Sequence, residues 1–344
     1  MKALVFEGVN DIKLKEVPMP VLEEGELLLK VKASLICGTD VRIYRGRKTK
    51  GVRTPSILGH EFAGVIEEVC GDVGEFKKGD LVSIAPIVPC LKCYYCKHDQ
   101  ENICLNRTAH GYEYDGGFAE YVKIPAAVLK SGNVYKVPEG VSIEDIPLAE
   151  PLACCINGQR QSPIKLGDAV VIFGAGPIGL MHLLLAKSSG GMVIVSEPNE
   201  KRRETALKLG ADIVVDPTSE DLETVVLNST DGIGADVVIM AIGIPALVND
   251  TLKIARKGGT INLFAGFSVG DMPPVDVNLI HYKELNITGT SASARRDHEK
   301  AIRLIKNGTI DASKIITHKF PLDQADEAFR VAESGEGIKV EILP

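Results

Sequence analysis

Short apolar runs separated by polar turns recur through the first 150 residues of the chain. These runs cover residues 27–33, 62–69, 81–84 and 118–124, and turns rich in Gly, Asp and Pro lie between them, as at Lys78-Gly79-Asp80. Short strands bounded by such turns are typical of antiparallel sheets. The pattern therefore predicts a β-rich region with irregular loops, folded as a bent sheet or a partial barrel.

The pattern changes near residue 165, where fully apolar runs of strand length begin to alternate with stretches of helical periodicity. Strands and helices that alternate at this spacing form a parallel sheet covered by helices on both faces, so we expect an α/β fold. The predicted strands are 169–173, 192–196, 213–215, 236–241 and 259–264, and the predicted helices are 177–189, 200–209, 219–228, 245–256 and 294–307.

The composition narrows the class of protein. A chain of 344 residues is long enough for two domains. Its net charge of -7 argues against a nucleic-acid partner, because phosphate backbones attract basic proteins. No apolar stretch is long enough for a signal core or a membrane span, so we expect a cytoplasmic protein without a membrane partner. In a reducing compartment, the eight cysteines indicate metal binding more than disulfides.

A glycine-rich turn follows the predicted strand 169–173. The segment matches the pattern G-x-G-x-x-G, and it lies between a buried strand and a helix, which is the context of a dinucleotide-binding turn. The first glycine makes the tight turn, the second lets a pyrophosphate approach the backbone, and the third permits close helix packing. The matching residues are Gly174, Gly176, Pro177, Ile178 and Gly179.

Glu197 directly follows the second predicted strand, one helix and one strand after the glycine-rich turn. A carboxylate at this position accepts hydrogen bonds from the adenosine ribose and repels a 2′-phosphate, which favours NAD over NADP. Arg202 and Arg203 leave NADP open as the alternative, because either could pair with a 2′-phosphate.

Four cysteines lie close together in one short segment, at Cys90, Cys93, Cys96 and Cys104. Four thiolates at this spacing suit a closed, structural zinc site. The alternative is an iron–sulfur cluster, but the ferredoxin run ends with a short gap and a Pro after its last Cys. Here the gap between Cys96 and Cys104 is longer and Leu105 follows, so the spacing favours zinc.

A second set of metal-binding side chains comes from separate segments. Cys37, His60, Glu61 and Glu150 offer sulfur, nitrogen and oxygen ligands, and a catalytic zinc keeps three protein ligands and one open position. Taken singly, each residue has an ordinary structural explanation. Spacing alone does not establish this set.

The ordered motifs resemble those of the zinc-containing medium-chain alcohol dehydrogenases, in particular the branch that acts on polyols. The resemblance covers essentially the whole chain. It rests on Cys37-Gly38-Thr39-Asp40, Gly59-His60-Glu61-Phe62-Ala63-Gly64, the four-cysteine segment, Gly116-Gly117-Phe118-Ala119-Glu120-Tyr121, Glu150-Pro151-Leu152 and the glycine-rich turn.

This resemblance implies a GroES-like catalytic domain of residues 1–150 and 290–344, with a structural zinc lobe at 90–104. It also implies a Rossmann domain of residues 151–289. It assigns the catalytic zinc to Cys37 and His60, with Glu61 or Glu150 as a further ligand, and a proton-relay hydroxyl to Thr39. Cofactor contacts are implied for Ile178, Glu197, Arg202 and the segment Phe264-Ala265-Gly266. Relatives also suggest two zinc ions per chain and a homo-oligomer, a dimer or a tetramer.

The implied activity is the NAD-linked oxidation of a secondary alcohol to a ketone, with a polyol, cyclitol, sugar acid or sugar phosphate as the small-molecule substrate. L-Threonine 3-dehydrogenase is the alternative, and a nucleotide-binding module without catalysis is a third hypothesis. Arg42 replaces the relay His of several relatives, and Ala292 replaces a substrate-binding Arg, although Arg295 and Arg296 follow nearby. The segment from Arg42 to Arg53 contains six basic residues, counting both ends. It is either a solvated loop or a guide for an anionic substrate.

Overall fold

The computed structural model describes residues 1–268 and 270–344, and the chain forms two compact units. The first unit contains residues 1–153 and 292–344, and the second contains residues 154–291. None of the described helices is both long enough and apolar enough to cross a membrane.

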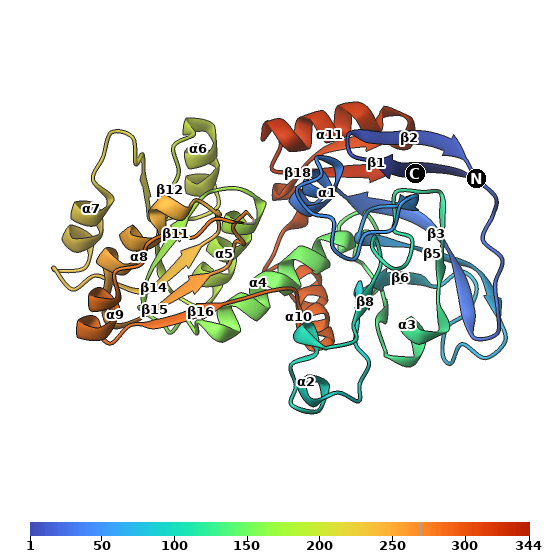
Figure 1. Ribbon diagram of the computed structural model, residues 1–344, viewed down its shortest axis with the longest axis horizontal. Coiled ribbons are helices and arrows are strands. Elements are labelled where there is room, and N and C mark those ends of the chain that lie inside the picture. Colours follow the sequence, from blue (N-terminus) through green and yellow to red (C-terminus); the bar gives the residue numbers. More distant parts are fainter. Residues whose placement is uncertain (269) are drawn as a thin grey trace. The chain divides into compact units, whose positions relative to one another are not determined.

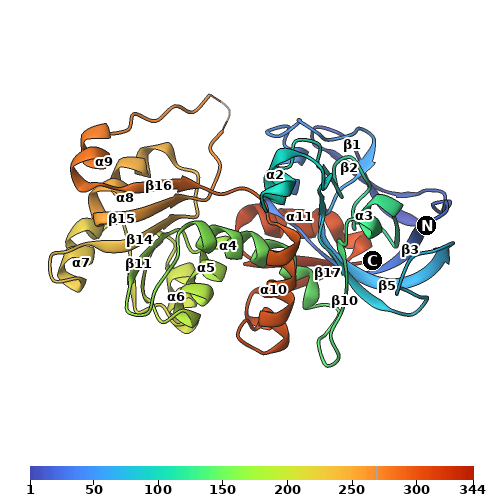
Figure 2. The same ribbon diagram turned by 90° about the horizontal axis from the view of Figure 1, so that it is seen from below.

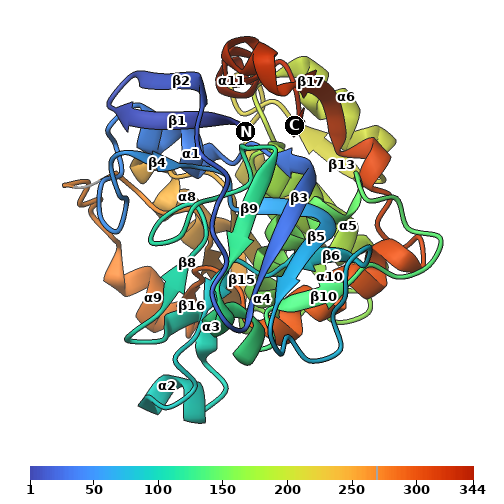
Figure 3. The same cartoon turned by 90° about the vertical axis from the view of Figure 1, so that its right-hand side faces the viewer.

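The first unit is β-rich, with curved strands seen face-on in Figure 3. Its largest sheet has the order β10-β6-β5-β3-β18-β17, with β9 paired to β3, and a three-stranded sheet has the order β2-β1-β4. The strands are β1 (Lys2–Gly8), β2 (Asp11–Glu16), β3 (Glu26–Leu35), β4 (Ser56–Ile57), β5 (Glu61–Cys70), β6 (Leu81–Ile84), β7 (Ile87–Val88), β8 (Thr108–Ala109), β9 (Tyr121–Ile124), β10 (Val134–Lys136), β17 (Ile316–Pro321) and β18 (Lys339–Leu343).

The neighbouring strands of this unit are antiparallel, except that β17 and β18 pair in parallel. Two apolar cores lie under the sheets. One gathers Leu29, Phe62 and Ile84 between β3, β5 and β6, and the other packs α11 against β1 and β18. The helices are α1 (Gly38–Tyr44), α2 (Tyr94–Lys97), α3 (Ala126–Lys130), α10 (Arg295–Lys306) and α11 (Ala325–Ser334), with single turns of 3-10 helix at Glu101–Ile103, Ile146–Leu148, Ala312–Lys314 and Leu322–Gln324.

The second unit is a parallel six-stranded sheet with the order β13-β12-β11-β14-β15-β16 (Figure 1). In Figure 2, α5 and α6 lie on one side of this sheet, and α8 and α9 lie on the other. The strands are β11 (Ala169–Phe173), β12 (Met192–Ser196), β13 (Ile213–Val215), β14 (Ala235–Met240), β15 (Ala255–Leu263) and β16 (Asn286–Gly289), and the helices are α4 (Ala149–Gln161), which begins in the first unit, α5 (Pro177–Ser188), α6 (Glu200–Lys208), α7 (Leu222–Ser229), α8 (Val248–Ile254) and α9 (Val277–Lys283), with a 3-10 turn at Pro245–Leu247.

The predicted α/β pattern of the second unit is confirmed, and the differences lie at element ends. The predicted helix 219–228 begins at Leu222, because the Asp221 side chain accepts the backbone N–H of Thr224 and caps the helix there. The predicted helix 245–256 is shorter, because residues from Ala255 onward join β15 instead. Strand order 3-2-1-4-5-6 is that of a Rossmann sheet, in which ligands bind at the carboxyl edge where the order reverses.

Candidate functional site

Strand register in the first unit brings three distant segments together. Leu35, the last residue of β3, pairs with Glu61 on β5 and with Glu341 on β18. Cys37 comes shortly after Leu35, and His60 directly precedes Glu61. The same register places Lys339 close to Glu61, although 278 residues separate them in sequence. The site is thus fixed by sheet pairing, because its members are remote along the chain.

Cys37, His60 and Glu61 form a compact cluster. One ligand atom from each lies within 4.8 Å of the others, and both His60 and Glu61 are buried. Cys37 is the N-cap of α1, and its backbone N–H donates a hydrogen bond of 2.9 Å to Asp40 Oδ2. The helix start therefore fixes the position of the thiol, and the cluster presents sulfur, nitrogen and oxygen donors to one point.

Asp40 supports His60 from the side. Its Oδ1 is 3.4 Å from His60 Nδ1, and Asp40 is fully buried. Burial lowers the pKa of His60, but the negative charges of Asp40 and Cys37 outweigh this and raise the pKa well above its ordinary value. Among the described residues, His60 Nδ1 has no hydrogen-bond partner beyond this ion-pair contact with Asp40. A buried imidazole nitrogen without a hydrogen bond, among acidic groups, fits a bound cation, and an S, N, O donor set suits zinc.

Lys339 is the buried partner of Glu61. Its Nζ lies 2.8 Å from Glu61 Oε1 and 2.6 Å from Oε2, and it also donates to the carbonyl of Ile36 at 3.0 Å. Burial lowers the pKa of Lys339. The negative charges of Glu61 and Cys37 raise it by more than burial lowers it, so the pKa lies above its ordinary value. The sequence motifs did not predict a role for Lys339. The only signal was a single Lys among the apolar positions of the last strand.

Glu150 and Thr39 lie beside the cluster in different ways. Glu150 is in the first turn of α4 and only 7% exposed; it lies outside the 4.8 Å group, although its charge raises the pKa of both Lys339 and Tyr112. Thr39 is in the first turn of α1, close to Cys37 along the chain. Tyr112 was also missed: its ring packs 5.9 Å from that of His60. The ligand roles of Cys37, His60, Glu61 and Glu150 stay predictions, and so does the relay role of Thr39.

The four predicted cysteines of the lobe do converge. One ligand atom from each of Cys90, Cys93, Cys96 and Cys104 lies within 4.8 Å of the others. The backbone N–H of Lys92 lowers the pKa of Cys90 to about 6, while burial raises that of Cys96 to about 12. Four convergent thiols, with backbone N–H groups donating to sulfur, have the chemistry of a structural zinc site.

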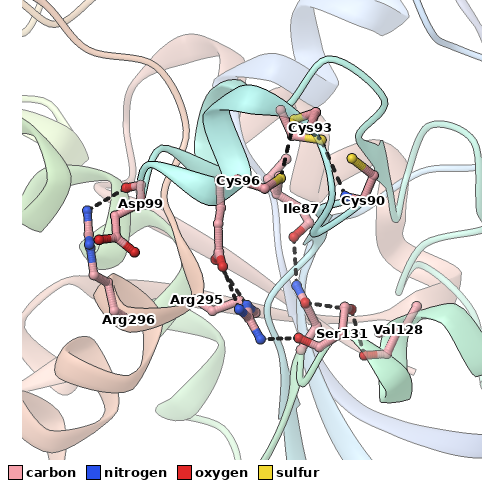
Figure 4. A network of polar contacts seen from close by, with 12 residues as sticks. Ile87, Cys90, Cys93, Cys96, Asp99, Val128, Ser131, Arg295 and Arg296 are labelled. Carbon is pink, nitrogen blue, oxygen red and sulfur yellow. Dashed lines mark hydrogen bonds and ion pairs between the residues drawn. The ribbon is translucent and has the colours of Figure 1, made fainter.

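Two arginines at the start of α10 anchor this lobe (Figure 4). The Arg295 guanidinium makes two hydrogen bonds to the Glu101 carboxylate and one to the carbonyl of Ser131. Arg296 donates to the carbonyl of Asp99 at 2.7 Å. Both arginines follow Ala292 closely in sequence, and their side-chain hydrogen bonds are with the lobe and its neighbours. Their role is therefore structural.

The glycine-rich turn lies at the carboxyl edge of the parallel sheet. Gly174 follows β11 with φ of +95°, a conformation that residues with side chains rarely adopt. A Cβ on Gly179 would lie 1.9 Å from the carbonyl oxygen of Gly174, so only glycine allows this close packing of α5. Gly176 caps α5, and Pro177 and Ile178 begin it, which leaves the helix N-terminus at the turn.

Glu197 directly follows β12 and is bonded to this turn. Its carboxylate accepts the backbone N–H of Ala175 at 2.8 Å and that of Asn199 at 3.0 Å. Arg203 is held by the carbonyls of Glu197 and Pro198 and by Asp216, whose Oδ2 is 3.1 Å from its Nη2. Arg203 is therefore engaged within the fold.

The remaining predicted cofactor residues lie at the same sheet edge or in the first turn of a helix. Arg202 is in the first turn of α6, and its backbone N–H is capped by Asn199. Phe264, Ala265 and Gly266 directly follow β15, and the Phe264 ring packs 4.6 Å from that of His182. Gly174, Glu197 and Phe264 each follow the end of a parallel strand, which is where a Rossmann sheet binds its ligand.

Two family models match the chain. Residues 23–139 match the alcohol dehydrogenase GroES-like domain, and residues 177–307 match the zinc-binding dehydrogenase domain. These matches confirm the fold class predicted for the two parts of the chain.

Individual relatives are similar over nearly the full length. L-threonine 3-dehydrogenase of Pyrococcus furiosus is 38% identical over 95% of this chain and 94% of its own. D-arabitol-phosphate dehydrogenase of Enterococcus avium is 35% identical over 97% of this chain and 94% of its own. A solved structure from Sinorhizobium meliloti, described as a zinc-binding dehydrogenase bound to NADP, has a TM-score of 0.93 and 31% identity, and the match covers 100% of this chain and 99% of that one.

Proposed function

Because this chain belongs to the zinc-containing medium-chain alcohol dehydrogenases and is an oxidoreductase acting on CH–OH groups, we propose that it oxidises a secondary alcohol of a polyol or sugar derivative to the ketone, with NAD as hydride acceptor. The observation that carries the proposal is the convergence of Cys37 with the buried side chains of His60 and Glu61, whose ligand atoms all lie within 4.8 Å of one another.

The ligands of the catalytic zinc would be Cys37 and His60, with a carboxylate from Glu61 or Glu150. A zinc ion held there supplies Lewis-acid chemistry, which lowers the pKa of a substrate hydroxyl. Asp40 holds the Cys37 backbone and lies beside His60, so it positions both ligands at once. Glu61 is fully buried, and Lys339 balances its negative charge. These contacts pre-organise the donors.

Thr39 is the proposed carrier of the proton that the alcohol loses. It lies in the same turn as Cys37, and a hydroxyl can accept one hydrogen bond while it donates another. Since Arg42 stands where relatives carry a relay His, the outward path beyond Thr39 must differ from theirs.

The preference for NAD rests on Glu197 at the end of β12. Glu197 is buried, and a carboxylate at the end of the second strand of a Rossmann sheet would face the adenosine ribose and oppose a 2′-phosphate. Arg203, one of the two candidate partners for such a phosphate, is occupied by two carbonyls and Asp216. Since a similar solved structure is bound to NADP, the rates of this chain with NAD and with NADP should be compared directly.

L-Threonine is the second candidate substrate, and the 38% identity to the Pyrococcus furiosus enzyme favours it. A panel decides between the two. Purified protein is analysed for zinc, and reduction of NAD and of NADP is followed with polyols, sugar acids, polyol phosphates and L-threonine. We expect two zinc ions per chain and faster turnover with NAD. Zinc near one per chain, or no cofactor reduction with any secondary alcohol, would refute the proposal; the fastest turnover with L-threonine would replace its substrate.

A further inference from the structure

The basic segment between Arg42 and Arg53 contains residues of two kinds. Arg45 donates to both oxygens of Glu333 and to Asn10, and Arg53 donates to Asp115 and to the carbonyl of Tyr112. These two arginines fasten the segment to α11 and to the loop after β8, so their charges are neutralised within the fold.

Lys48 differs from them. Its side chain is half-buried and lies over the Tyr112 ring, with Nζ 5.2 Å from the ring centre. Among the described residues, no carboxylate lies within ion-pair distance of Nζ. Tyr112 also contacts His60, whose ring centre lies 5.9 Å from its own. The distance from Lys48 Nζ to the His60 ring centre is therefore no greater than the sum of these two distances. Both residues belong to the first unit.

Further positive charges act on Lys48, and its backbone N–H donates a hydrogen bond of 3.2 Å to the carbonyl of Arg42. Burial first, and then Arg42, Arg107 and Lys50, lower the pKa of Lys48, while Glu113 partly opposes them. The Glu113 carboxylate already accepts the backbone N–H of Ala109 at 2.9 Å. Positive charges near a half-buried ammonium repel it, which destabilises the site when no anion is bound. A bound anion offsets this repulsion.

We propose that Lys48, with Arg42 and Arg107 beside it, binds the phosphate group of a phosphorylated polyol whose hydroxyl is oxidised at the Cys37–His60 cluster. This inference rests on the proposed function for the oxidation step. Three cations suit a dianion better than the single charge of a carboxylate. Tyr112 contacts both Lys48 and His60, so it links the proposed phosphate position to the cluster.

The test compares Lys48→Gln with Arg47→Gln, a matched control that removes one positive charge from the neighbouring, exposed residue. The probes are D-glucitol, D-glucitol 6-phosphate and D-gluconate. We expect wild type to prefer the phosphate over D-glucitol. Lys48→Gln should raise KM for the phosphate about tenfold to a hundredfold with kcat nearly unchanged, and leave D-glucitol kinetics as they were. Arg47→Gln should behave as wild type.

Binding of inorganic phosphate to the zinc-loaded protein, measured by calorimetry, separates this inference from the proposed function. Weaker phosphate binding in Lys48→Gln alone supports the anion site even if no alcohol is oxidised. Three results overturn the inference: equal losses in both variants, a Lys48-dependent preference for D-gluconate over the phosphate, or equal phosphate binding by wild type and Lys48→Gln. Turnover of D-glucitol together with one of these results would leave the proposed function standing.

Discussion

The two candidate metal sites of the first unit differ in how the chain brings their donors together. The four-cysteine lobe takes all its donors from one short segment between Cys90 and Cys104, and its sulfur atoms are held by backbone N–H groups. The Cys37–His60–Glu61 cluster takes its donors from the ends of two paired strands, and charged side chains surround it. The lobe offers four identical sulfur donors. The Cys37–His60–Glu61 cluster offers sulfur, nitrogen and oxygen donors and has buried charged side chains around it.

This difference predicts that the four-cysteine lobe serves stability and that the Cys37–His60–Glu61 cluster serves the reaction. Four thiolates complete a tetrahedral shell, so nothing else can enter it. A site with three protein donors keeps a position for substrate, and its buried charges must be balanced by other residues. Asp40 and Lys339 have this role here. We therefore expect changes at the two clusters to affect different measurements.

The largest effect should come from exchanging one cysteine in each cluster. Cys37→Ser should lower kcat by about a thousand-fold or more, because Lewis-acid assistance contributes several kcal/mol. Its melting temperature should stay close to that of wild type. Cys104→Ser should lower the melting temperature by roughly 5–10 °C, while activity per folded molecule is largely retained. Full turnover in Cys37→Ser, or lost turnover with an unchanged melting temperature in Cys104→Ser, would break the distinction.

The same contrast explains what could be predicted from the sequence. The lobe is encoded locally, so spacing alone predicted its four ligands. The glycine turn and Glu197 were also predictable, because each directly follows a buried strand. Lys339 and Tyr112 were not, since only the register of β3 with β5 and β18, and the packing of a loop on His60, bring them to the cluster. Pairing between segments near opposite ends of the chain leaves no periodic signal.

An intermediate effect should follow from removal of the Lys339 charge. Lys339→Met leaves Glu61 buried without a partner, which costs about 3–5 kcal/mol of the free energy of unfolding. Urea unfolding of zinc-free protein measures this loss. The control is Lys78→Met, whose partner Glu67 is exposed and whose loss should hardly change stability. The double variant Lys339→Met, Glu61→Gln should recover much of the difference. If Lys339→Met alone is as stable as wild type, the ion pair does not support the cluster.

The smallest effect concerns how the lobe is anchored. Arg295 makes a bidentate ion pair with the Glu101 carboxylate and a third hydrogen bond to the carbonyl of Ser131. The ion pair is largely shielded from solvent. Arg295→Met should cost about 1–3 kcal/mol, because hydrogen bonds to charged groups are stronger than neutral ones. Arg303→Met on the same helix loses an exposed pair with Glu299 and should cost within about 0.5 kcal/mol.

Zinc release shows whether Arg295 acts on the lobe itself. In a Cys37→Ser background the lobe is the zinc site that remains intact, and transfer of its zinc to a coloured chelator can be timed. We expect Arg295→Met to speed this transfer and Arg303→Met to leave it unchanged, because docking on α10 limits how far the lobe can open. Equal transfer rates in the two variants would mean that the lobe holds its metal through its local sequence alone, which would make the contrast with the Cys37 cluster sharper still.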